Sequence, residues 1–114
     1  MIKEYLKNYR GNRDLVKYLD GKITAQAKLG DYPEDDLHAR EHFARLVAEI
    51  DQALSLLQNP NEQRLLRLRY IEGWSWTKIG FAIHYSRSQL KRIHARALGH
   101  LEEISEREGL LWEE

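Results

Sequence analysis

Residues 70–98 carry the pattern that most constrains this chain, because their apolar, glycine and capping residues have the spacing of two short helices joined by a tight turn. Gly73 can supply a left-handed stop to the preceding helix, and Ser75 can cap the next one. Ser86 can cap a second helix, where Gln89 completes a Ser-x-x-Gln capping box. Five apolar residues can then pack the two helices together: Ile79, Ile83, Tyr85, Leu90 and Ile93. The sequence therefore predicts a helix-turn-helix.

The second helix of this motif has cations on positions that such packing leaves free, and no acid occurs from Gln89 through His100. Residues 61–100 hold eight Lys and Arg against two acids, although the net charge of the whole chain is zero. Clustered cations suit the DNA backbone, and Arg and Gln at the start of such a helix can read base edges. A solvated helix face is the alternative, but it normally mixes both signs of charge. We expect base contacts from Arg87, Ser88, Gln89 and Arg92, and phosphate contacts from Lys78, Lys91 and Arg96.

Other kinds of chemistry find no support in the residue pattern. The chain has no cysteine, which excludes a disulfide framework and a thiolate zinc site. His38 and His42 share a helix face, but no third ligand or intervening glutamate fits the His-Glu-x-x-His pattern. No catalytic triad, phosphate-binding glycine loop or isolated carboxylate pair emerges. The sequence therefore predicts no enzyme, no cofactor and no metal site.

Length and composition favour a single helical unit. The chain has 114 residues, enough for one compact domain or a small domain with an appendage. Apolar residues make up 42% and charged residues 32%, with two prolines, which favours an all-α fold over disorder. No apolar run approaches the roughly 20 residues of a membrane span, and the N-terminus lacks the long apolar stretch of a signal peptide. We expect a cytoplasmic protein that does not contact a membrane.

The first half of the chain is expected to form an antiparallel helical hairpin. Residues 2–29 show helical periodicity, with a break or bend near Gly11. Gly30 and Pro33 can end this helix and start another that should run to about Gln58. The second helix has apolar residues at heptad-like spacing: Phe43, Val47, Ile50, Leu54 and Leu57. The pattern alone leaves open whether this seam closes within one chain or between two.

The chain is expected to divide into three parts. Residues 1–58 form the hairpin, which serves dimerisation or partner contact, and residues 59–101 form a tri-helical DNA-binding domain. Pro60 marks the joint, and Asn61 can cap the helix that follows it. We expect Trp76 to pack the core of the domain and to fix the angle between its helices. Residues 102–114 form an acidic C-terminal tail, which is either a solvated helix end or a contact surface.

The segment LRLRYIEGWSWTKIGFAIHYSRSQLKRIHARALGHL resembles the helix-turn-helix of the fourth conserved region of bacterial sigma factors, which reads a promoter element. The hairpin and the junction NPNEQRLLRLRYIEG resemble small phage proteins of the RinA/ArpU type, regulators of late-gene transcription. The resemblance implies a first helix at residues 76–83, a turn at 84–86 and a reading helix at 87–98 in the major groove. Two features depart from the family: His84 stands where glycine is usual, and Lys78 follows Thr77 where two acids are often found.

We interpret the chain as a sequence-specific double-stranded DNA-binding transcriptional regulator of phage or prophage genes. One alternative is a sigma-like adaptor that binds RNA polymerase rather than DNA. Another is a DNA-recognition subunit of a phage packaging machine. Double-stranded DNA is the expected partner, and RNA polymerase and a second copy of the chain are further candidates.

Overall fold

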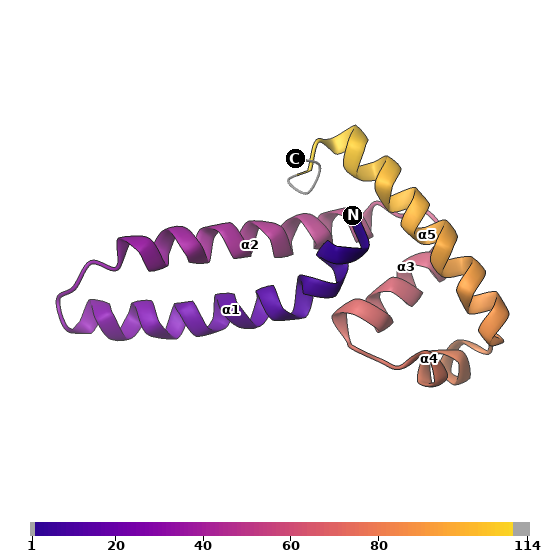
Figure 1. Cartoon of the computed structure of the whole chain (residues 1–114), viewed down its shortest axis with the longest axis horizontal. Helices are drawn as coiled ribbons and strands as arrows, with labels where there is room; N and C mark the ends of the chain where they lie inside the picture. The colour runs from indigo at the N-terminus through magenta and orange to yellow at the C-terminus, as the bar shows by residue number, and fades with distance from the viewer. Residues whose placement is uncertain (1, 111–114) are drawn as a thin grey trace.

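The computed structural model describes residues 2–110, which contain five α-helices, one π-helical segment and no strand. Helices α1 and α2 form a long hairpin, and α3, α4 and α5 form a thicker unit at its root (Figure 1). The predicted all-α fold is confirmed, and the elements follow the predicted order. The bounds are Ile2–Lys28 for α1, Glu34–Ser55 for α2, Pro60–Leu66 for α3, Arg67–Ile71 for the π-helical segment η1, Trp76–Ile83 for α4 and Arg87–Glu108 for α5.

The hairpin closes within one chain, and polar contacts between α1 and α2 set its register. Near the tip, Lys22 Nζ lies 3.2 Å from Asp36 Oδ2. Near the root, the Tyr9 hydroxyl donates a hydrogen bond of 2.8 Å to Asp51 Oδ1. The predicted seam is unevenly buried, because its three members nearest the root are buried and the other two are half-buried. In chain order these residues are Phe43, Val47, Ile50, Leu54 and Leu57.

Helix α1 is continuous through Gly11, so no break occurs at this residue, whereas the first turns of α1 bend away from the rest of the helix (Figure 1). A glycine inside a helix costs about 1 kcal/mol relative to alanine. Leu6 and Tyr9 on one side of it and Leu19 on the other are buried, and burial of a large apolar side chain stabilises by about 1.5–3 kcal/mol. The stabilisation gained by packing α1 against α2 therefore exceeds the cost of placing Gly11 inside a helix.

The hairpin root and the C-terminal unit share one core. Its fully buried large apolar side chains come from every helix: Leu6, Leu54, Leu65, Leu66, Ile79 and Leu101. The molecule is elongated, with extents of 55 × 31 × 19 Å, because the hairpin projects beyond this core (Figure 1). No helix among residues 2–110 is both long enough and apolar enough to cross a membrane.

The junction between hairpin and C-terminal unit differs from the prediction in two details. Helix α2 ends at Ser55, earlier than the predicted Gln58. Asn59, not Asn61, caps α3: its side chain accepts hydrogen bonds from the Asn61 and Glu62 amides at 2.9 and 3.2 Å. Proline suits the first helical turn, so the cap lies one residue before it and not one residue after. The Asn61 side chain instead donates to the hydroxyl of Tyr85 at 3.0 Å.

The π-helical segment η1 is a feature that the sequence did not predict. The Glu72 amide donates to the Arg67 carbonyl at 2.9 Å, a hydrogen bond one residue wider than that of an α-helix. Gly73 follows with a φ of 74°, so the left-handed stop predicted at this glycine is confirmed. The segment brings Tyr70, which is buried, beneath α5.

Helix α5 continues beyond the predicted reading helix and through Gly99 to Glu108. Ile104 is buried in this last part, and so is Leu110, which follows the left-handed Gly109. The described part of the expected acidic tail, residues 102–110, is therefore packed as a helix end and its cap. Residues 111–114 of that tail lie outside the described residues.

Candidate nucleic-acid interface

Local hydrogen bonds fix the starts of α4 and α5. Ser75 Oγ accepts from the Lys78 amide at 3.1 Å. Gln89 Oε1 accepts from the Ser86 amide at 2.8 Å, and Ser86 Oγ accepts from the Gln89 amide at 3.2 Å. Both predicted caps are confirmed, and the second is a complete capping box. Both helices therefore begin where the sequence predicts.

The turn between the two helices is tight. His84 has φ 60° and ψ 41°, the left-handed conformation in which glycine is usual. Gly80 lets α4 approach the turn and α5, since an added Cβ would lie 3.1 Å from the Tyr85 carbonyl oxygen and 3.4 Å from Leu90 Cδ1. Ile79 and Leu90 are buried beside this approach. The angle between α4 and α5 is thus set by close packing.

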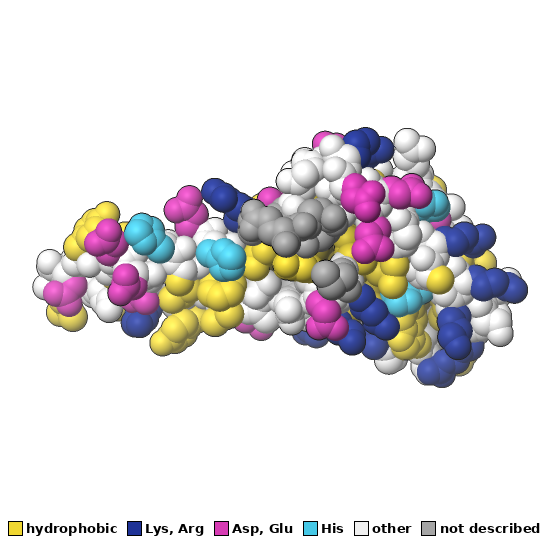
Figure 2. Space-filling view, turned by 45° about the horizontal axis from the view of Figure 1, so that its top comes forward, with side chains coloured by type: hydrophobic (Ala, Val, Ile, Leu, Met, Phe, Trp, Pro, Cys, Tyr) yellow, Lys and Arg dark blue, Asp and Glu magenta, His cyan; other side chains and the backbone are white. Residues whose placement is uncertain are grey.

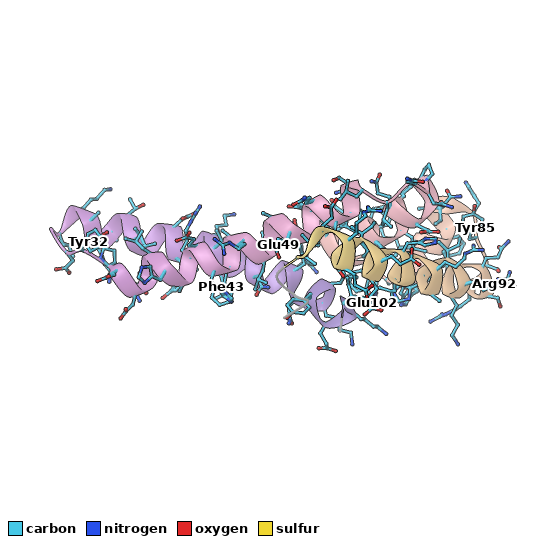
Figure 3. All side chains as sticks on the ribbon, turned by 90° about the horizontal axis from the view of Figure 1, so that it is seen from above. Tyr32, Phe43, Glu49, Tyr85, Arg92 and Glu102 are labelled. Carbon is cyan, nitrogen blue, oxygen red and sulfur yellow. The ribbon has the colours of Figure 1, made fainter. Side chains whose placement is uncertain are left out.

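Helix α5 has one buried and one exposed face. The buried face carries Leu90, Ile93, Ala97 and Leu101. The exposed face carries Ser88, Lys91, Arg92 and Ala95, whose spacing places them side by side on one face of the helix. Small side chains at Ser88 and Ala95 let the helix backbone come close to a partner surface. Arg92 lies at the end of the molecule opposite Tyr32, which marks the hairpin tip (Figure 3).

All the predicted DNA contacts are exposed: Lys78, Arg87, Ser88, Gln89, Lys91, Arg92 and Arg96. None of their cations takes part in an ion pair within residues 2–110. Lys and Arg side chains gather on the thick unit away from the hairpin, whereas the hairpin carries charges of both signs (Figure 2). The cations of α5 are therefore free to meet an anionic partner.

A depression borders the exposed face of α5 on each side. Arg87 and Lys91 line the first, together with Trp76 of α4 and Lys3 of α1. Lys78 lies apart from both, in the first turn of α4. The second depression is lined by three predicted contact residues, Gln89, Arg92 and Arg96. It is also lined by Asn59 and Asn61 at the start of α3 and by Tyr85 in the turn. Ser88 lies in neither depression. The predicted residues other than Lys78 thus occupy a central face of α5 and its two flanks.

Two of the predicted contact residues already have intramolecular partners. The amide oxygen of Gln89 is held by the capping box, which leaves its NH₂ group as the free half of the side chain. The ammonium group of Lys78 lies 4.0 Å from the centroid of the Trp74 ring. A cation–π contact at an exposed site is weak, about 0.5–1 kcal/mol, so it orients the ammonium group without neutralising it.

Behind the exposed face, an aromatic cluster holds α5 against α4 and η1. Half-buried Trp76 lies between the Arg69 guanidinium, 4.8 Å from the ring centroid, and the His94 ring, 4.9 Å between centroids. The Tyr70 hydroxyl and His94 Nε2 are 2.8 Å apart. Burial lowers the pKa of His94, with smaller contributions from the cations of Lys3 and Arg69, so its ring is neutral at pH 7. Trp76 packs against the core, as predicted.

Helix α3 is tied to α5 by a buried carboxylate. Glu62 is 3% exposed, and its Oε1 lies 2.6 Å from His100 Nδ1. The hydrogen bond with Glu62 raises the pKa of His100, and the charge of Glu62 adds to the effect. A buried carboxylate needs such a partner, so we assign this pair a structural role.

Sequence reasoning missed the residues that other elements bring to the flanks. Asn61 and Tyr85 are joined by a hydrogen bond of 3.0 Å beside Gln89, although 24 residues separate them in the chain. Lys3 reaches the α5 flank only because the start of α1 packs against the C-terminal unit. No local pattern signals either contact, since both depend on how distant segments pack.

A comparison with protein families matched residues 53–108 to Sigma-70, region 4. The match starts within the last turn of α2 and ends at the last residue of α5. Searches of curated proteins and of solved structures gave no match.

Proposed function

We propose, from the premise that residues 53–108 are a DNA-binding helix-turn-helix of the sigma-70 region 4 kind, that this chain binds double-stranded DNA sequence-specifically and regulates transcription. Phage or prophage genes are the proposed targets, because the hairpin and junction resemble phage regulators. The observation that carries the proposal is the exposed face of residues 87–100 of α5, which contains no acid and is held outward by a buried apolar face. A rod with one cationic face suits the major groove.

Each residue of this surface receives a role from its position. Arg87 and Arg92 read base edges, because an exposed guanidinium can grip guanine O6 and N7 with two hydrogen bonds. Ser88, on the central face, contacts a base at short range. Gln89 contributes its NH₂ group to a base acceptor, since its oxygen is engaged in the cap. Phosphates are bound by Lys78, Lys91 and Arg96.

A sigma-like adaptor that binds RNA polymerase is the rival function, and one observation favours a protein contact. Phe81 on α4 is 80% exposed, on the side of the helix away from the buried Ile79. Leu29 and Tyr32 at the hairpin tip are exposed to the same extent. Large apolar side chains of this kind suit a protein partner, such as polymerase or a second copy of the chain. A DNA-bound regulator can use the same contact, so only a measurement of DNA affinity distinguishes the two functions.

The test is selection of a binding site from random duplexes, followed by isotherms at several salt concentrations. Four to six neutralised phosphates predict that log affinity falls with log salt at a slope of roughly −4 to −5. Arg92→Ala should cost about 1–3 kcal/mol and relax specificity at one position. Arg45→Ala is the matched control, because Arg45 is an exposed hairpin arginine.

Equal binding of Arg92→Ala and the parent on every sequence would remove Arg92 from the reading surface. Polymerase capture by a chain that has no affinity for any duplex would select the adaptor instead.

A further inference from the structure

We propose that α1 is part of the DNA-binding surface: Lys3, Lys7 and Arg10 bind backbone phosphates of the same duplex whose major groove receives α5. This inference rests on the proposed function and extends its site into the hairpin, for which the sequence predicts only dimerisation or partner contact. The three residues are called the α1 row below. They are exposed, and their spacing of four and three places them on one face of the helix.

The upper end of the α1 row lies beside the reading helix. Lys3 lines the depression that also holds Arg87 and Lys91, the two cations on that flank of α5. His94, at the floor of the same depression, has its pKa lowered in part by the charge of Lys3. Lys3 is therefore close enough to α5 to meet a strand that passes over Lys91.

The lower end of the α1 row lies beside the start of α4. The guanidinium of Arg10 occupies the space next to Gly73 where a Cβ would stand, so it covers the loop that leads into α4. Trp74 follows directly, and its ring carries the ammonium group of Lys78. A band of cations thus runs from Lys91 along the α1 row to Lys78.

The dimensions and charges of the band suit a phosphate backbone. From Lys3 to Arg10 the α1 row spans about 10 Å, the axial length that holds about three phosphates of one strand. Glu4, Asp14 and Glu72, the acids nearest in the chain, pair with none of these cations within residues 2–110. Basic side chains gather along the lower edge of the thick unit, with an acidic side chain beside them (Figure 2).

The experiment compares two triple variants that lose the same charge. One replaces the α1 row, Lys3→Gln, Lys7→Gln and Arg10→Gln, and the other replaces exposed cations of the outer hairpin, Lys17→Gln, Lys28→Gln and Arg45→Gln. The probe is a labelled duplex of mixed sequence of about 30 base pairs, because non-specific binding consists of phosphate contacts. Binding is measured by anisotropy from low to physiological salt.

We expect the salt slope of the α1 row variant to be shallower than that of the parent by about 2 to 3, since each phosphate contact contributes about 0.9. The outer hairpin variant should keep the parent slope, because charges beyond about 10 Å are screened. Hydroxyl-radical footprints should lose protection on one flank of the selected site and keep it at the centre. Equal slopes for the two variants, with parental binding intact, would overturn the inference alone.

Two further outcomes are an unfolded triple variant and a parent chain that does not bind DNA. If circular dichroism shows that the Arg10 substitution unfolds the chain, the pair Lys3→Gln, Lys7→Gln replaces the triple variant, and its slope should be shallower by about 1 to 2. An unchanged slope for the folded pair would reject the α1 row. A parent chain that binds no duplex would reject the proposed function and this inference together.

Discussion

Single residues in this chain serve both folding and the proposed binding. Gln89 closes the cap of α5 with its oxygen and presents its NH₂ group outward. His84 takes the left-handed turn conformation that glycine would adopt without strain, and the sequence correctly placed the turn there. The capping box predicted from the sequence already assigns the side-chain oxygen of Gln89 to the Ser86 amide. The hydrogen bond of Asn61 with Tyr85 beside Gln89 could not be predicted, because it joins segments 24 residues apart in the chain.

His100 should make stability depend on pH. The hydrogen bond with Glu62 raises the pKa of His100 above its ordinary value of about 6.5. The protonated ring pairs with the carboxylate in the folded state, so the stabilisation is complete below about pH 6.5 and is lost as pH rises through the higher folded pKa. We expect the difference in unfolding free energy between the parent and His100→Gln to shrink as the pH rises above about 6.5 and through the raised pKa of His100.

The comparison must be between variants, because His94 acts in the opposite direction. Burial lowers the pKa of His94, so its protonation in acid opposes folding. Denaturant titrations of the parent, His100→Gln and the exposed control His38→Gln measure the difference. A pH-independent gap between the parent and His100→Gln would contradict the assigned role of the pair.

At the scale of helices, capping residues made the starts of two helices in the C-terminal unit predictable. Ser75 and Ser86 act locally, within three residues, so α4 and the start of α5 could be read from the sequence alone. The π-helical turn of η1 has no such local signature. The uninterrupted path of α1 through Gly11 was decided by burial against α2.

The cap of α5 should be measurable as stability. Ser86→Ala removes the oxygen that accepts the Gln89 amide and should destabilise the chain by about 0.5–2 kcal/mol. Ser86→Asp should restore most of the loss, since aspartate caps helices as well as serine does. Thermal unfolding followed by circular dichroism reads out all the variants.

Ser88→Ala is the matched control for this element, because Ser88 is exposed and outside the cap. It should change stability by less than about 0.5 kcal/mol, although it lies on the proposed DNA face. A loss of equal size for Ser86→Ala and Ser88→Ala would mean that the capping box does not determine the start of α5.

At the scale of the whole molecule, the hairpin reaches far beyond the shared core. Its outer part holds few buried residues, and Tyr18 on α1 is 64% exposed. The sequence predicted the hairpin from its heptad-like seam, but it could not predict that the start of α1 packs beside α5. The α5 part of the candidate site was predicted because it lies within one helix. Lys3 was missed because its place depends on packing between distant segments.

A shortened hairpin should separate DNA binding from any function of the tip. Excision of residues 16–22 with 38–44 removes one heptad from each helix and keeps opposite partners aligned, because Asp20 pairs with Arg40. The root contacts, including the hydrogen bond of Tyr9 with Asp51, remain. We expect affinity for a short duplex to stay within about twofold, since the removed charges lie beyond the screening length.

Anisotropy with the same labelled duplex and a melting curve check this expectation. A folded, shortened chain that loses DNA affinity would show that the outer hairpin itself contacts the duplex or pairs two copies on it.

Helix α5 is a single rod of 22 residues whose first turns carry the reading surface and whose last turns pack near α2. Because α5 has no break, the direction in which the hairpin points around the duplex is fixed once α5 lies in the groove. Moving the site by about five base pairs, half a helical turn, swings the hairpin to the opposite side of the double helix. The side of the duplex on which the tip holds a partner is therefore set by the position of the binding site along the DNA.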